Sequence, residues 1–214
     1  MKPVPRISTR GYYDLRTGKT LKKNNYYLYP KKDFQKLIDS KELTIMIHGL
    51  RNDNAGAIAK AVLARNRLRK LGYSHPVIGF SYDSNTTGAH LIKHAKHALA
   101  VGQSIAKKNG RNLGKFIEDF KESSPKTKIR LMGHSLGSQV ILSTIEYLAK
   151  KKESTHPNKI GKSLKESLTY IFTSRPLDLS KEATLYATIP VFSNKNYAGH
   201  GDNICAVIIF VLQI

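Results

Sequence analysis

A serine with a glycine two residues before it and another two residues after it marks segment 133–137, Gly-His-Ser-Leu-Gly. The bare pattern occurs by chance in about one chain in ten, so its surroundings decide its meaning. It directly follows an apolar run at 129–132 and directly precedes a helical pattern. A serine on such a sharp strand-to-helix turn projects its hydroxyl above the sheet edge, where side chains at Gly133 and Gly137 would collide. The helix then directs N–H groups toward developing negative charge, so Ser135 is a candidate nucleophile.

An earlier loop can supply the hydrogen-bond donors that acyl transfer needs. The apolar, β-branched run at 43–47 predicts a buried strand, which ends at His48-Gly49. A tetrahedral oxyanion is stabilised by two N–H groups aimed at it. We expect the backbone N–H of Leu136, directly after the serine, and that of Leu50, directly after His48-Gly49, to form this oxyanion hole.

The periodicity of apolar residues predicts the elements that carry these loops. Short strand candidates lie at 10–14 and 25–29, with a turn at 17–20 between them. Apolar runs predict further buried strands at 43–47, 76–82, 128–133, 167–172 and 185–192. Helical patterns cover 57–71 (capped by Asn54 and stopped by Gly72), about 90–120 (interrupted near Gly110) and 138–150. Strands that alternate with helices predict an α/β fold: a three-layer, doubly wound and mostly parallel sheet.

These motifs together resemble an α/β-hydrolase of the lipase or esterase kind. The pentapeptide at 133–137 and the strand-His-Gly loop at 43–50 carry the likeness. Gly-Phe-Ser-Tyr-Asp at 79–83 and Lys-Asn-Gly-Arg-Asn-Leu at 108–113 are similar to pieces of small prokaryotic members. The likeness is good over 43–150 and loose elsewhere. It implies an eight-stranded sheet and a triad in the chain order serine, acid, histidine.

The resemblance leaves two candidates for the triad acid. Asp202 lies in a segment, Asn-Tyr-Ala-Gly-His-Gly-Asp-Asn-Ile at 196–204, that is similar to the acid loop of the family, and it is the preferred candidate. Asp178, after the expected strand at 167–172, is the alternative acid.

The triad histidine is harder to identify. Only His156 and His200 follow Ser135 in the chain, and the family base normally comes after the acid and beyond one more strand. The sequence stops 12 residues after Asp202, within an expected last strand at 206–212. Either a histidine-bearing end is missing, or His200 serves with Asp178 as its acid. His200 can equally be an ordinary surface histidine.

Length and composition predict the class of protein and its cellular compartment. A chain of 214 residues fits a single domain, with a strand hairpin region at 1–40 and the core at 41–214. Cys205 is the only cysteine, so an intramolecular disulfide is excluded. The longest apolar run, 204–212, is about half a membrane span. With no apolar stretch near the start, the sequence predicts a cytoplasmic protein without a transmembrane segment.

The charge balance is strongly positive, with 36 Lys+Arg against 15 Asp+Glu and a formal net charge of +21. Such an excess indicates either a polyanionic partner or a solvated, Lys-rich surface. The basic residues are spread along the chain, and no element interleaves them with aromatics for base stacking. The distribution therefore favours the solvated surface and predicts no dedicated nucleic-acid module.

Three further histidines have the spacing of metal ligands. His90, His94 and His97 would lie along one side of a helix, but no Glu follows the first of them, and Lys93 and Lys96 flank the row. We interpret these three histidines as part of a solvated helix flank, and we expect structural roles for His48 and His134. We expect neither a metal nor a cofactor.

The functional hypothesis is a serine hydrolase that acts on a small-molecule ester or lipid through a Ser135 acyl-enzyme. Two alternatives stay open. One is an inactive or truncated hydrolase-fold protein that acts as a binding module. The other is a basic protein that binds polyanions.

Overall fold

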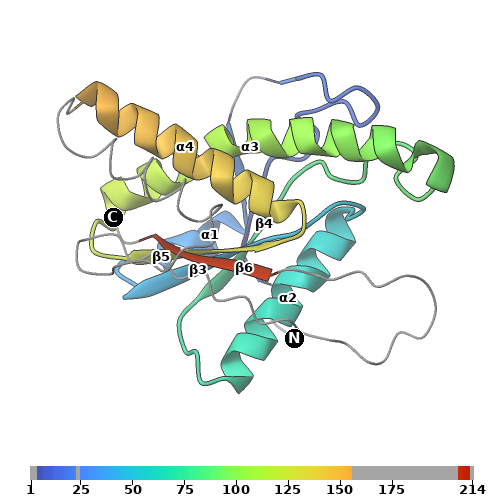
Figure 1. The fold of residues 1–214 in the computed structure, drawn as a ribbon. Coiled ribbons are helices and arrows are strands. Elements are labelled where there is room, and N and C mark those ends of the chain that lie inside the picture. The colour runs from blue at the N-terminus through green and yellow to red at the C-terminus, as the bar shows by residue number, and fades with distance from the viewer. Residues whose placement is uncertain (1–3, 23–24, 156–206, 213–214) are drawn as a thin grey trace, which may run out of the picture.

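A six-stranded mixed sheet forms the centre of the computed structural model, which describes residues 4–22, 25–155 and 207–212 (Figure 1). The strand order is β2-β1-β4-β3-β5-β6. The strands are β1 (Arg6–Ser8), β2 (Tyr27–Tyr29), β3 (Glu42–Ile47), β4 (Val77–Ser81), β5 (Lys128–His134) and β6 (Val207–Leu212). The inner strands β1, β4, β3 and β5 are parallel, while β2 and β6 pair antiparallel at the edges.

Helices cover both faces of this sheet. They are α1 (Lys31–Gln35), α2 (Asn54–Lys70), the 3-10 turn η1 (Ile92–His94), α3 (Ala95–Ser123) and α4 (Gly137–Thr155). Figure 1 shows α3 and α4 on one face and α2 on the other. The prediction of a three-layer, mostly parallel α/β fold is therefore confirmed. Among the described residues, no helix combines the length and hydropathy that a membrane crossing requires.

The central strands are apolar because helices cover them on both sides. Every residue of β3 and β4 is buried, as expected for inner strands of a parallel sheet. Their side chains form one core with the inner faces of α3 and α4. The fully buried residues of this core include Ile7, Leu43, Ile45, Ile47, Ile78, Phe80, Ile105, Leu113, Ile117, Val140 and Ile141. This core fixes the ends of β3 and β5, where the candidate site lies.

The helix α3 is continuous at Gly110, so the predicted interruption is wrong. Gly110 is buried where α3 crosses α4, and a Cβ atom there would collide with the backbone of Ser143. One turn later, a Cβ atom on Gly114 would collide with the ring of Tyr147. The glycines weaken the isolated helix but let the two helices approach closely, and the packing that results compensates for the loss of helix propensity.

Near the N-terminus the structure differs from the expected pair of strands. Residues 10–14 form no strand, because the buried carboxylate of Asp83 accepts the N–H groups of Gly11, Tyr12 and Tyr13 at 3.0, 3.0 and 3.1 Å. The strand beside β2 is instead β1, four residues earlier than expected.

Two further elements differ in detail. Asp53, not Asn54, caps α2, because its Oδ1 accepts the Gly56 N–H at 2.7 Å. The last expected strand is present as β6. The expected strands at 167–172 and 185–192 lie outside the described residues.

Replacing Gly110 by alanine should destabilise the protein. In an exposed helix this change gains roughly 1 kcal/mol of helix propensity, but here the methyl group would push α3 away from Ser143. We expect a loss of about 1–3 kcal/mol in the free energy of unfolding, measured in urea. Gln103→Ala, on the exposed side of the same helix, is the control and should change stability by less than about 0.5 kcal/mol. A Gly110→Ala protein that is more stable than the wild type would contradict the packing described.

Candidate functional site

Ser135 occupies the sharp turn between β5 and α4. β5 ends at His134 and α4 begins at Gly137, so only Ser135 and Leu136 connect the two elements. The φ angle of Ser135 is 51°, in the left-handed region that a non-glycine residue rarely adopts. Its carbonyl accepts the Ser138 N–H at 2.9 Å, which fixes the turn. The Ser135 side chain is exposed above the carboxyl end of the strand.

The two glycines of the pentapeptide lie where backbone segments meet. A Cβ atom on Gly133 would be 2.9 Å from the Gly137 carbonyl carbon and 2.8 Å from the Ile141 side chain. A Cβ atom on Gly137 would collide with the carbonyl oxygen of Ile47, at the end of β3. At each glycine at least one of these contacts is with backbone atoms, which cannot move aside as a side chain can, so larger residues would displace the turn that holds Ser135.

The loop after β3 passes directly against this turn. A Cβ atom on Gly49 would be 2.9 Å from the His134 carbonyl oxygen and 3.0 Å from the Ser135 Cβ. The loop that begins with Leu50 therefore lies beside the serine, as the sequence analysis expects. Among the described residues, the N–H groups of Leu50 and Leu136 have no hydrogen-bond acceptor.

The side chains of these two leucines converge on α3. A Cβ atom on Gly102 would be 2.6 Å from the Leu50 Cδ1 and 3.1 Å from the Leu136 Cδ2. Gly102 thus leaves room for both side chains against the helix. This packing fixes the two residues relative to each other, and with them the backbone N–H groups predicted to bind an oxyanion.

The His48 side chain supports the loop, and its ring bonds residues other than Ser135. Its ring is buried and stacks on Tyr82, with the two ring centres 4.6 Å apart. The Tyr82 N–H donates to Nε2 at 3.2 Å, so the proton lies on Nδ1, which donates to the Gly49 carbonyl at 3.0 Å. Burial and, to a smaller extent, the positive charge of Arg10 together lower the pKa of His48 to about 3, against the opposing effect of the hydrogen bond to the Gly49 carbonyl. His48 is therefore neutral, and its contacts are those of a structural residue.

Residues 50–52 of the loop are held by their own hydrogen bonds. The Asn52 amide donates to the Gly49 carbonyl at 3.0 Å and to the Leu50 carbonyl at 2.8 Å. The Arg51 N–H donates to the Ser84 carbonyl at 3.0 Å, and Arg51 has a φ angle of 63°. A loop fixed in this way directs its free N–H group without reorganisation, which is the requirement for oxyanion binding.

Arg10 connects the same loop to the N-terminal segment. Its Nη2 donates to the carbonyls of Asn52 and Asp53 at 3.0 and 2.7 Å, and its Nε donates to the Ser81 hydroxyl at 2.7 Å. Burial lowers the pKa of Arg10, and the nearby Asp83 carboxylate opposes that shift. Sequence analysis missed Arg10, because its partners are carbonyl groups about 40 residues away and nothing in the local sequence marks it.

The structure does not test the remaining triad residues. Asp178, Asp202 and His200 all lie outside the described residues. Among the residues that are described, none hydrogen-bonds the Ser135 hydroxyl. The base and the acid therefore stay predictions.

The predicted row of three histidines does not exist as a helix face. α3 begins only at Ala95, so His90 precedes it and His94 belongs to η1. His90 pairs with the Asn85 Oδ1 at 3.0 Å, and His97 with the Arg16 carbonyl at 3.2 Å. In the described part of the chain, no group of three or more His, Cys, Asp or Glu side chains is placed to hold a metal ion.

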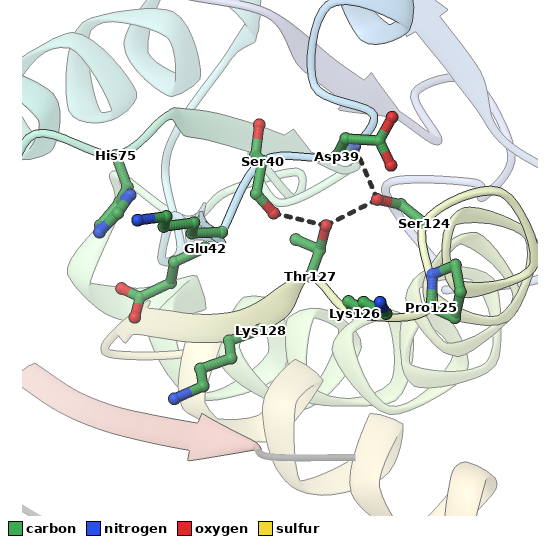
Figure 2. Close-up of a pocket in the computed structure, with 10 residues that line it drawn as sticks. Asp39, Ser40, Glu42, His75, Ser124, Pro125, Lys126, Thr127 and Lys128 are labelled. Carbon is green, nitrogen blue, oxygen red and sulfur yellow. Dashed lines mark hydrogen bonds between the residues drawn. The ribbon is translucent and has the colours of Figure 1, made fainter.

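A hollow of about 720 Å³ lies at the opposite end of the sheet, where β3 and β5 begin (Figure 2). Many of its polar groups bond one another. The Asp39 N–H donates to Ser124 Oγ at 2.8 Å, the hydroxyls of Ser124 and Thr127 lie 2.7 Å apart, and Thr127 donates to the Ser40 carbonyl at 2.6 Å. This hollow is separate from the serine site, which lies past the other ends of the same strands.

The buried His48 should make stability depend on pH. Its pKa is about 3 in the folded protein and 6.5 when exposed, so the unfolded chain binds a proton that the folded protein excludes. The contribution of neutral His48 to the free energy of unfolding is complete above pH 6.5. It falls by about 1.4 kcal/mol for each pH unit below 6.5, down to the pKa of the folded protein. Urea unfolding at several pH values from about 7 to about 5 should show a flatter profile for His48→Asn than for the wild type. The exposed His94→Asn should keep the wild-type slope, and an unchanged slope in His48→Asn would contradict the burial argument.

Comparison with known proteins places this architecture in a family. The family described as alpha/beta hydrolase of unknown function (DUF900) matches residues 30–174, which is more than half of the chain. The matched range holds β3, β4 and β5, the loop at 48–53 and the Ser135 turn. Neither a curated protein nor a solved structure matches the chain. The protein belongs to this family of alpha/beta hydrolases of unknown function.

Proposed function

We propose that the protein is a serine hydrolase that cleaves carboxylic esters through an acyl-enzyme on Ser135. One observation carries the proposal: an exposed serine is held at a φ angle of 51° on a strand-to-helix turn, in contact with the loop after β3. A left-handed serine is strained by about 1–3 kcal/mol, and such strain persists where the surroundings enforce it, often at functional sites.

The expected reaction begins with attack of the Ser135 Oγ on the carbonyl carbon of the ester. The carbonyl π electrons move to oxygen, and the resulting oxyanion is positioned to accept hydrogen bonds from the Leu50 and Leu136 N–H groups. The first turn of α4 adds its partial positive charge at the same place. Collapse of this intermediate expels the alcohol and leaves the acyl group on Ser135, and water then releases the acid.

Proton transfer needs a base, because a serine hydroxyl is a poor nucleophile at neutral pH. We assign this role to His200, oriented by Asp202 or by Asp178. The histidine takes the serine proton during attack and returns it to the leaving alcohol. This chemistry requires no metal and no cofactor.

Labelling with a fluorophosphonate probe tests the proposal. The probe phosphorylates an activated serine, so the wild type should be labelled and Ser135→Ala should not. Ser138→Ala, which removes the next hydroxyl along the chain, is the matched control and should be labelled like the wild type. Turnover of a p-nitrophenyl ester by Ser135→Ala should fall by at least about 100-fold, since oxyanion binding alone leaves a small residual rate.

Equal labelling of the wild type and Ser135→Ala would contradict the proposal, because another nucleophile would then react. A wild type that folds but takes up no label would favour the inactive, binding-module alternative.

A further inference from the structure

The start of α3 exposes large apolar side chains to solvent. Ile92 is 96% exposed, Leu91 is 51% exposed and Leu99 is 43% exposed. Lys93 and Lys96 lie between them and are exposed as well. We call these five residues the α3 corner. Figure 1 shows η1 and the first turns of α3 at the end of the helix that projects beyond the sheet.

No acidic residue balances this corner along the chain. Between Asp83 and Glu118 the sequence contains no Asp or Glu, and Asp83 is buried with its carboxylate bonded to backbone N–H groups. The exposed side of α3 continues the positive charge through Lys107, Arg111 and Lys115, which follow one another at intervals of four residues. The corner thus joins bulky aliphatic groups to a basic stretch of the sequence that contains no acidic residue.

The α3 corner lies at the start of the same helix that packs against the serine site. The Thr86 hydroxyl donates to the Ala98 carbonyl at 2.9 Å, which ties the helix to the segment after β4. Gly102, three residues after Leu99, lies against the Leu50 and Leu136 side chains. The helix α3 therefore connects the corner to the residues that lie beside the Ser135 turn.

We propose that the α3 corner docks the protein on an anionic phospholipid surface. Leu91 and Ile92 enter the acyl region, where they leave water, while Lys93 and Lys96 contact the headgroups. Apolar groups bordered by lysines are the combination that binds such interfaces. A nucleic-acid partner fits less well, because segment 84–117 contains no Tyr or Trp, and its one Phe, Phe116, is buried and cannot stack on a base.

Docking gives the proposed hydrolase a substrate class. Esters of membrane lipids would be presented to Ser135 by the surface on which the protein lies. This consequence rests on the proposed function, whereas docking itself does not require catalysis.

Vesicle sedimentation tests the docking proposal with the full chain. The probe is vesicles of equal parts phosphatidylserine and phosphatidylcholine, compared with vesicles of phosphatidylcholine alone. We expect binding to the first kind only. Ile92→Ser should weaken that binding by about tenfold, and Lys93→Gln with Lys96→Gln should do so by at least about tenfold. Ser135→Ala should bind like the wild type, so failure of docking and failure of catalysis are separate results.

Matched controls lie elsewhere on the molecule. Leu71, 78% exposed at the end of α2, provides Leu71→Ser, and the exposed Lys31 and Lys32 provide a double Lys→Gln change. Both should bind vesicles like the wild type. If the double Lys→Gln control weakens binding as much as the corner lysine variant does, the net charge of the chain explains the attraction, and if Leu71→Ser weakens it as much as Ile92→Ser does, the apolar contact is not specific to the corner. Either result overturns the proposal. Equal binding to both vesicle types, or no binding to either, would overturn the proposal too. So would a single-stranded RNA that displaces the protein from the vesicles and that the Ile92→Ser variant binds as tightly as the wild type does.

Discussion

The contact between the end of β3 and the turn after β5 is the constraint on which the rest of the site depends. The two strands are neighbours in the parallel sheet, so their carboxyl ends meet at one edge. At that edge the backbone atoms of Ile47, His48 and Gly49 lie against those of the Ser135 turn, with glycine at each point of closest approach. Because no side chain separates the two loops, the N–H groups of Leu50 and Leu136 are brought near the serine. Ser135 has its left-handed conformation at this same point of close approach.

Support for this contact comes from residues that make no contact with the serine. His48, neutral and buried, joins the loop to β4, and Arg10 joins the end of the loop to the N-terminal segment. Asp83 in turn holds that segment by accepting three consecutive N–H groups. Residues 4–22 are therefore part of the support of the site, although the family match begins only at residue 30. Oxyanion stabilisation requires such rigidity, because donors that must reorganise lose much of their effect.

Much of this arrangement could be predicted from the sequence, and the exceptions have physical reasons. The buried strands at 43–47, 76–82 and 128–133 and the Ser135 turn produce short-range signals, namely apolar runs and glycines at fixed spacing, and the structure places them where those signals indicate. Gly110 suggests a helix interruption because glycine is unfavourable in a single helix, and only its close approach to Ser143 explains why the helix continues through it. Residues 10–14 were misjudged because a carboxylate about 70 residues away bonds their backbone. The predicted histidine row does not form, because His90 and His94 precede the helix and so do not follow its spacing. Asp178, Asp202 and His200 stay predictions.

The crystal structure of the fluorophosphonate adduct tests the central claim most directly, because it shows both the nucleophile and the groups that receive the negative oxygen. We predict a covalent bond from phosphorus to the Ser135 Oγ, with the phosphoryl oxygen about 2.7–3.1 Å from the Leu50 and Leu136 nitrogens. The loop at 48–53 should keep the hydrogen bonds it makes without the adduct. An adduct on another residue, or a phosphoryl oxygen that points to solvent away from both N–H groups, would contradict the account.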